Sequence, residues 1–408
     1  MTACRASAPA ASAEDVVALV REHCRPLAAE RVALTDALRR VLREPVRAPE
    51  DQPAFDRSSV DGYAVRLDEP GSQFRIVDEI RAGNWKPRVL APGECVRIAT
   101  GGALPGERLQ VVMKEDVEVG DGIVRALRRD AAVNIRFRGE DTRAGAVLVD
   151  KGTRLNPGAL SLLASLGHTR PLVTRLPRVR HVATGNEIVP PEQTPQRGQI
   201  RDSNSTLVRA FLGQWGIEPE QVRTGDDQVD IESAVTRPTT PLAVPDLLLV
   251  SGGASVGEQD CTGALFDGLG YRIHLRRTNT RPGKPLIFAT HGHTLAFGLP
   301  GNPLAHFVCL NLFVRAALDR LAGLDQETVF TAGVLAGELN LDGNSRETLW
   351  PARVRVAGGR CELAPLRWSS SGDLTCLATA DALLRVPPGC RMLPAGSVVS
   401  FVSTTVSR

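Results

Sequence analysis

The sequence predicts a multidomain protein of the α/β plus β class, and three observations support this prediction. Strands alternate with helices from about residue 178 to residue 322, which is typical of a doubly wound parallel sheet. Short strands and turns predominate before this region, from about residue 46, and after it, from about residue 326. The 408 residues are enough for two to four domains with separate cores.

Composition narrows the kinds of partner. The net charge of +3 argues against nucleic acid or a membrane surface as the main partner. No apolar run reaches the roughly 18 residues of a membrane span, and the first dozen residues lack the apolar core of a signal peptide. The eight cysteines are scattered without zinc-site spacing, so we expect reduced thiols and a cytoplasmic protein.

The N-terminal part of the chain predicts three helices. Ser12 to Asp15 forms a capping-box pattern, and an amphipathic helix is expected to follow it. A second helix is expected near Thr35 to Leu42, with Leu38 buried. A third is expected to begin at Asn156-Pro157 and to end at Gly167.

The β-rich region holds three polar segments. Asp61-Gly62 is a turn signal within residues 55–65 that also suits a plain hairpin, and Thr100 stands at the end of a predicted strand. Further on, Arg136 and Arg138 would lie on one side of an extended strand, which suits an anion, although such a charge run also suits a solvated face.

The α/β region contains two loops of small residues that follow predicted strands. One is Ser251-Gly252-Gly253, and the other is Pro300-Gly301-Asn302, where Asn302 is expected to be the N-cap of a helix. Backbone N–H groups in such loops, and at a helix start, attract anions. Each loop alone could be a simple turn.

Charged residues near these loops favour a ligand. The turn from Arg281 to Lys284 is basic, and Asp260 is an isolated acid before a predicted helix. Glu187 and Asp226 follow other strands, and ligands of open α/β sheets bind at the carboxyl ends of strands. We therefore expect one pocket for a phosphorylated ligand with a metal ion.

Eight segments, in order along nearly the whole chain, resemble the molybdopterin molybdenumtransferases, the molybdenum insertases that include the C-terminal domain of gephyrin. The segments are residues 55–64, 100–105, 134–141, 184–187, 251–257, 281–285, 298–303 and 371–374. The resemblance implies four domains: an elongated, discontinuous domain I for dimerisation (14–45 and 140–177), a β-rich insert (46–139), an α/β molybdopterin-binding domain (178–322) and a C-terminal small β-barrel (323–408).

The resemblance also implies a homodimer, with the site formed by the α/β domain of one subunit and the Asp61 region of the other. The implied substrates are adenylylated molybdopterin and molybdate, and the implied cofactor is Mg²⁺. Molybdate is inserted at the dithiolene, and the adenylyl bond is cleaved to release AMP. A molybdopterin adenylyltransferase and molybdoenzymes are the implied partners. A non-catalytic molybdopterin scaffold, or an adenylyltransferase, is the alternative.

The family's functional residues carry over onto matching positions. Those implied as catalytic are Asp61, Asp141, Glu187 and Asp260, and those implied as metal ligands are Glu187, Asp226 and Asp260. Those implied to bind substrate are Thr100, Arg136, Asp226, Ser251, Gly252, Gly253, Arg277, Arg281, Lys284, Pro300, Gly301, Asn302 and Ser371.

Two features depart from the family pattern. Arg277 and Arg281 stand where many relatives have Lys. The planar guanidinium group of arginine, with several N–H donors, thus replaces the compact ammonium group of lysine. His306 follows the second loop, and we expect it to be a packing or surface residue.

Overall fold

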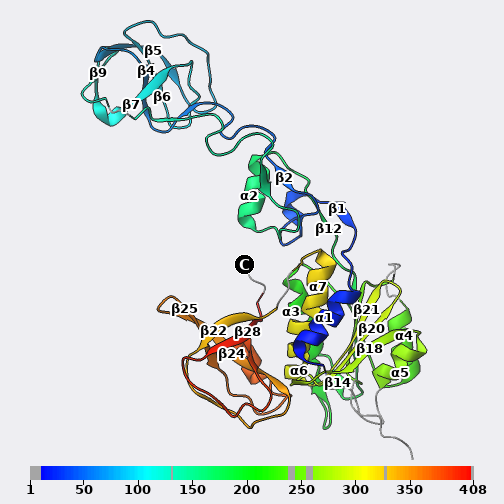
Figure 1. Cartoon of the computed structure of the whole chain (residues 1–408). Coiled ribbons are helices and arrows are strands. Elements are labelled where there is room, and N and C mark those ends of the chain that lie inside the picture. The colour runs from blue at the N-terminus through cyan, green and yellow to red at the C-terminus, as the bar shows by residue number, and fades with distance from the viewer. Residues whose placement is uncertain (1–10, 130–131, 238–243, 254–260, 326–328, 406–408) are drawn as a thin grey trace, which may run out of the picture. The chain divides into compact units, whose positions relative to one another are not determined.

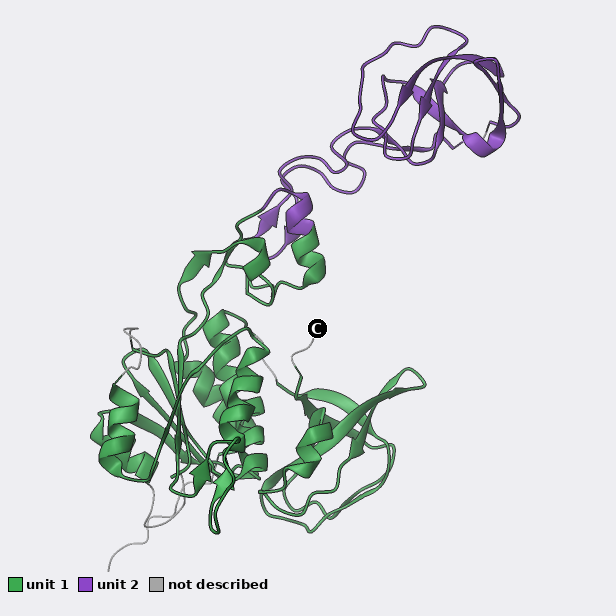
Figure 2. Cartoon of the chain, turned by 180° about the vertical axis from the view of Figure 1, so that it is seen from behind, with its two compact units in different colours: residues 1–44, 152–161, 169–408 green, residues 45–151, 162–168 purple. Residues whose placement is uncertain are grey.

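The chain folds into two compact units (Figure 2). The computed structural model describes residues 11–129, 132–237, 244–253, 261–325 and 329–405. Unit 1 comprises Met1–Glu44, Gly152–Ser161 and Thr169–Arg408, and unit 2 comprises Pro45–Lys151 and Leu162–His168.

Unit 2 is built around a six-stranded sheet in the order β7-β4-β6-β5-β9-β8. The β-rich character predicted for this region is confirmed. The strands are β4 (Gly62–Arg66), β5 (Gln73–Ile80), β6 (Glu94–Ile98), β7 (Leu109–Met113), β8 (Val117–Gly120) and β9 (Ile123–Ala126). Two short ladders lie outside this sheet: β3 (Arg57–Ser58) with β10 (Ile135–Arg136), and β2 (Val46–Arg47) with β11 (Val147–Val149).

The main sheet of unit 1 has six strands in the order β16-β13-β17-β21-β20-β18. They are β13 (Val179–Thr184), β16 (Glu220–Thr224), β17 (Leu247–Ser251), β18 (Arg272–Arg277), β20 (Pro285–His291) and β21 (Thr294–Leu299). The first four in spatial order are parallel, as predicted, and the last two pairings are antiparallel. Only Gly292 and His293 join β20 to β21, and so short a connection makes a hairpin rather than a parallel crossover.

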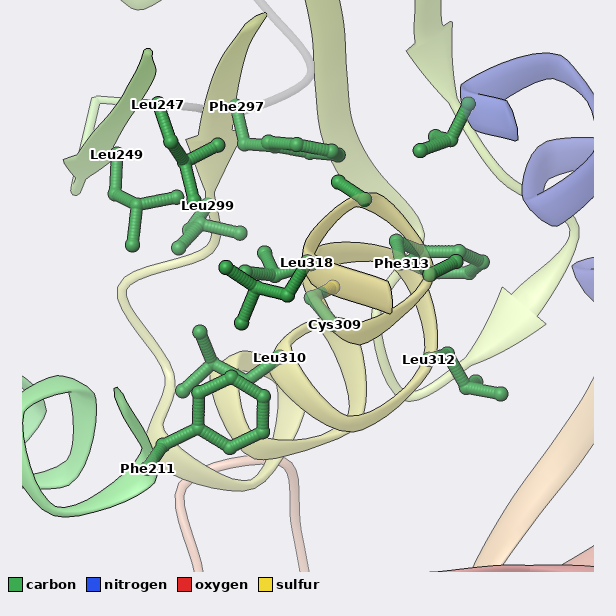
Figure 3. Close-up of a cluster of buried hydrophobic side chains, with 14 of the residues drawn as sticks. Phe211, Leu247, Leu249, Phe297, Leu299, Cys309, Leu310, Leu312, Phe313 and Leu318 are labelled. Atoms are coloured by element: carbon green, nitrogen blue, oxygen red, sulfur yellow. The ribbon is translucent and has the colours of Figure 1, made fainter. Parts of the chain in front are cut away.

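Helices cover both faces of this sheet (Figure 1). One face carries α4 (Gln228–Thr236) and α5 (Cys261–Gly268), which pack on Val182, Leu248 and Val250. The other carries α1 (Ala13–His23), α3 (Ser203–Gly213), α6 (Pro303–Cys309) and α7 (Arg315–Ala322). The core on that second face includes Phe297, Leu310 and Phe313 (Figure 3).

A π-helical turn, Leu310–Val314, joins α6 to α7, so one continuous helical run reaches Ala322. All five residues of the turn are buried. The run ends at Gly323 in the left-handed conformation, with φ +90°.

The C-terminal region of unit 1 is a closed five-stranded barrel. It consists of β22 (Thr331–Leu335), β24 (Glu347–Ala357), β25 (Arg360–Pro365), β26 (Ala382–Val386) and β28 (Val398–Ser403). Pairing runs β24-β25-β22-β28-β26, and β26 pairs back to β24, which closes the barrel. The short strand β19 (Thr280–Arg281) adds to β24 from the α/β region.

The capping box at Ser12 is present, and α2 (Pro157–Ser165) begins as predicted. The second predicted helix is wrong, because only a 3-10 turn, Leu34–Asp36, forms there. Leu42 instead pairs in an extended bridge with Val173, and Leu38 is 44% exposed. No helix in the described part of the chain is long and apolar enough to cross a membrane.

Candidate functional site

A pocket of about 610 Å³ lies at the carboxyl ends of the parallel strands of unit 1. Eight of the residues predicted for the site line it together. They are Glu187, Asp226, Ser251, Gly252, Gly253, Pro300, Gly301 and Asn302. The parallel order of β16, β13, β17 and β21 causes this convergence, since their carboxyl ends meet at one edge.

Two glycines allow the backbone to line the pocket closely. Gly252 has φ +99°, and a β-carbon there would lie 2.6 Å from the carbonyl oxygen of Thr184. Gly185 has φ +143°, and a β-carbon there would lie 2.5 Å from the Glu187 carboxylate. Gly252 is therefore needed for conformation and for space, whereas Gly185 is needed for conformation, because the Glu187 carboxylate could move away from a β-carbon.

Two carboxylates line the pocket without a basic partner among the described residues. Asp226 accepts a hydrogen bond from the backbone N–H of Asn186 (3.1 Å), and the Asn186 side chain accepts from the N–H of Asp226 (3.3 Å). This exchange fixes the loop after β16 to the loop after β13, which carries Glu187. Carboxylate oxygens are the ligands that Mg²⁺ prefers.

The described residues contain no group of three or more His, Cys, Asp or Glu side chains that could hold a metal ion by themselves. Asp260, the third predicted metal ligand, lies outside the residues that the structure describes. Glu187 and Asp226 therefore fit a hard cation as part of a donor set that the ligand's own oxygens would complete.

Asp202 lines the same pocket, and sequence reasoning missed it. It is the N-cap of α3, where it accepts from the N–H and the hydroxyl of Ser205 and from Nε of Arg223 (2.9 Å). Burial opposes ionisation of Asp202, but these hydrogen bonds outweigh it, so its pKa is below the ordinary value. The sequence signal that could have identified Asp202 is its position as an N-cap residue directly before a predicted helix.

Two fully buried histidines lie behind the pocket. His181 on β13 has its Nε2 2.6 Å from the hydroxyl oxygen of Ser251. His306 on α6 donates from Nδ1 to the carbonyl oxygen of Pro300 (3.1 Å). Burial lowers the pKa of His181 to about 3 and that of His306 to about 4, so both rings are neutral at physiological pH. His306 was expected to be a packing or surface residue, and it is buried.

The second loop leads into α6 with Asn302 as N-cap and Pro303 in the first turn, as predicted. The Asn302 side chain makes no capping bond and instead donates to the hydroxyl of Ser371 (2.9 Å). The N–H of Leu304 donates to the carbonyl oxygen of Ser371 (3.0 Å). Ser371, from the C-terminal region, is thereby held against the pocket loop.

The three basic residues of unit 1 that were predicted for the site do not line the pocket. Arg281 pairs with Asp342 and lies 5.5 Å from the ring of Trp368, so it contacts the C-terminal region. Arg277 and Lys284 are exposed. The planar guanidinium of Arg281 suits a carboxylate and an aromatic face at once, which lysine would not match.

Unit 2 holds a second cluster of predicted residues, around Asp61. Its carboxylate accepts from the N–H and the hydroxyl of Thr100 (both 2.8 Å) and pairs with Nζ of Lys114 (3.2 Å). The bonds from Thr100, and then that from Lys114, lower the pKa of Asp61 to about 2. Lys114, at the start of a 3-10 turn that follows β7, was not predicted for the site.

Arg136 in unit 2 pairs with Glu140 and with Asp141, and Arg138 pairs with Asp51. The two arginines thus have carboxylate partners within their own unit. An anion bound by Arg136 would have to compete with Asp141, which the sequence pattern did not reveal.

The chain is similar to known proteins along nearly its whole length. Three family models match in order: "MoeA N-terminal region (domain I and II)" over residues 11–167, "Probable molybdopterin binding domain" over 180–320, and "MoeA C-terminal region (domain IV)" over 333–403. A molybdopterin molybdenumtransferase of Bacillus subtilis is 33% identical over 386 residues, 91% of this chain and 89% of that protein. The chain belongs to the molybdopterin molybdenumtransferase family.

Other relatives of the family agree. A molybdopterin molybdenumtransferase of Staphylococcus aureus strain Mu50 is 30% identical over 91% of this chain and 90% of that protein. A crystal structure described as a molybdopterin biosynthesis MoeA protein, from Pyrococcus horikosii, superposes with a TM-score of 0.79 at 27% identity, covering 98% of this chain and all of that one. As a member of this transferase family the chain serves molybdenum cofactor biosynthesis, and its pocket lies within the region matched by the molybdopterin-binding model.

Proposed function

We propose that the chain inserts molybdate into adenylylated molybdopterin, with Mg²⁺-dependent cleavage of the adenylyl bond and release of AMP. The observation that carries this proposal is the pocket, which joins two loops rich in backbone N–H groups to two carboxylates without basic partners among the described residues. N–H groups suit phosphate oxygens, and carboxylates suit a divalent cation.

The carboxylates also explain why a cation is needed. Glu187 and Asp226 would repel a pyrophosphate group, and Arg201 is the basic side chain among the described residues that line the pocket. In the proposal Glu187, Asp226 and Asp260 hold Mg²⁺, which neutralises phosphate charge as the P–O bond breaks. The backbone of Gly252, Gly253 and Gly301 positions the phosphates.

We further propose a cytoplasmic homodimer in which Asp61, Thr100, Arg136 and Asp141 of one subunit serve the pocket of the other. Arg277, Arg281, Lys284 and Ser371 remain proposed substrate contacts, with Ser371 supported by its bond to Asn302. The four-domain division given above is part of the same proposal. A molybdopterin adenylyltransferase would supply the substrate, and molybdoenzymes would receive the product.

The metal assignment is tested by the Mg²⁺ dependence of AMP release. Glu187→Gln and Asp226→Asn should each raise the Mg²⁺ concentration needed for half-maximal rate by at least about tenfold, because each removes one anionic ligand. Glu192→Gln removes an exposed carboxylate that does not line the pocket, and it should leave that concentration unchanged. Equal Mg²⁺ dependence in all three variants would contradict the assignment.

The dimer assignment is tested by complementation at limiting Mg²⁺, where the Asp61→Ala and Glu187→Gln variants should each be inactive. Asp61→Ala and Glu187→Gln chains, unfolded and refolded together in equal amounts, should regain activity toward a quarter of the wild-type rate. Half of the dimers should be mixed, and half of the sites in the mixed dimers contain both intact residues. Each variant refolded alone should stay inactive. Mixtures no more active than the separate variants would show that the residues do not cooperate across subunits.

A further inference from the structure

Ser251 is the last residue of β17 and lines the pocket, and its hydroxyl has a buried partner behind it. The partner, His181, lies on the neighbouring parallel strand β13, where it is in register with Leu249, two residues before Ser251. Paired residues of adjacent strands point to the same face of a sheet. His181 and Ser251 therefore meet diagonally, with Nε2 2.6 Å from Oγ.

Gln221 on β16, on the other side of β13, fixes the protonation of this ring. Its Nε2 lies 2.8 Å from the carbonyl oxygen of Ser205 and 3.0 Å from Nδ1 of His181. Its Oε1 accepts from Nε of Arg209 at 3.0 Å. If the amide were reversed, its oxygen would face the carbonyl oxygen of Ser205 and its NH₂ group would face the N–H of Arg209, and neither pair could form a hydrogen bond. The orientation of the Gln221 amide is therefore determined. Nδ1 of His181 is thus a hydrogen-bond acceptor.

The state of Ser251 follows from that of His181. A neutral imidazole has one N–H, and when Nδ1 accepts, the proton is on Nε2. Nε2 of His181 therefore donates to Oγ of Ser251. The proton of the Ser251 hydroxyl then has no acceptor among the residues that the structure describes. It is left for a group in the pocket.

We propose that His181 and Gln221 are positioning residues, which hold the Ser251 hydroxyl as a hydrogen-bond donor to a phosphate oxygen of the bound substrate. The proposal rests on the proposed function, because it takes the pyrophosphate-linked substrate as the ligand. Phosphate oxygens are only acceptors, so a serine held as a donor favours them over ligand groups that donate. Both residues act through Ser251 and do not themselves line the pocket.

The test is the dissociation constant of adenylylated molybdopterin for the full chain, measured with Mg²⁺ and without molybdate so that the substrate is not consumed. Ser251→Ala should bind about tenfold to a hundredfold more weakly, the range for a hydrogen bond to a charged group. His181→Leu should also weaken binding. In the Ser251→Ala background, however, His181→Leu should change binding by less than about twofold, since the partner through which it acts is gone.

Two further variants separate positioning from packing. His181→Gln can place an amide N–H near the position of Nε2 and should bind more tightly than His181→Leu. Gln221→Met keeps both His181 and Ser251 but releases the choice of tautomer, so its affinity should lie between wild type and Ser251→Ala. Circular dichroism establishes that each variant is folded, and Gln221→Met carries the test if His181→Leu is not.

A matched control exists at the edge of the sheet, where His274 on β18 contacts the hydroxyl of Thr290 (2.8 Å) away from the pocket. His274→Leu should leave binding unchanged. The proposal is overturned if Ser251→Ala binds like wild type, or if His181→Leu weakens binding by the same factor with and without Ser251. A wild-type chain that does not bind the substrate at all would instead remove the proposed function, and this inference with it.

Discussion

Gly252→Ala tests the close approach of the first pocket loop to its neighbouring strand. A β-carbon would lie 2.6 Å from both the carbonyl oxygen and the hydroxyl of Thr184, and φ of +99° is unfavourable for alanine. The conformation costs about 1 to 2 kcal/mol, and overpacking typically adds about 1 to 3 kcal/mol. We therefore expect the free energy of unfolding to fall by about 2 to 5 kcal/mol, and substrate binding to weaken because the loop must move.

Two controls separate the contributions. Gly216 has φ +73° and open space around it, so Gly216→Ala should show only the conformational penalty, about 1 kcal/mol after the entropy gained from stiffening the unfolded chain. Gly213, in α3, has no neighbour within 4 Å and no positive φ, so Gly213→Ala should be neutral or slightly stabilising.

The assay is urea unfolding followed by circular dichroism, with substrate affinity measured in parallel. A Gly252→Ala variant no less stable than Gly216→Ala, and with wild-type affinity, would refute the close approach of the loop to Thr184.

Two further predictions concern carboxylates held by identified partners. Thr100→Val removes the hydroxyl bond to Asp61, so the pKa of Asp61 should rise from about 2 toward its ordinary value, as NMR titration of the carboxyl carbon would show; an unchanged pKa would contradict the contact. Burial raises the pKa of Asp246, but the paired bonds from Arg175 (both 2.7 Å) and the N–H of Arg178 lower it overall. Its stabilisation is therefore present above the unfolded pKa near 4 and is lost as the pH falls through the folded pKa. Arg175→Met should lower the free energy of unfolding at pH 7 by about 3 kcal/mol, the lower end of the range for breaking a buried pair, because Arg175 is partly exposed. It should also flatten the loss of stability below pH 4; a variant that loses stability with falling pH as steeply as the wild type would contradict this account.

Much of the pocket could be predicted because its signals are local. Gly252 and Gly253 follow an apolar strand, and Asn302-Pro303 opens a helix, so the two loops were identifiable without knowledge of their neighbours. That they meet at one edge follows from the alternation of strands and helices, which implies a parallel sheet.

The contacts that sequence reasoning missed depend on strand order and register. His181 stands among apolar residues of β13, and nothing local indicates that Gln221 flanks it on one side and Ser251 on the other. Arg281 likewise finds Asp342, 61 residues further along the chain. The prediction of the second helix was also wrong because of distant contacts. Leu42 finds its backbone partners at Thr153 and Val173, more than 100 residues further along the chain.

The central claim is that the pocket acts on adenylylated molybdopterin with molybdate and Mg²⁺. The most direct test is AMP release from this substrate by the purified full chain, with each component omitted in turn. We expect AMP to form only when molybdate and Mg²⁺ are both present, and to be lost in the Glu187→Gln variant at limiting Mg²⁺. AMP release that proceeds equally without molybdate, or no release under any of these conditions, would contradict the claim.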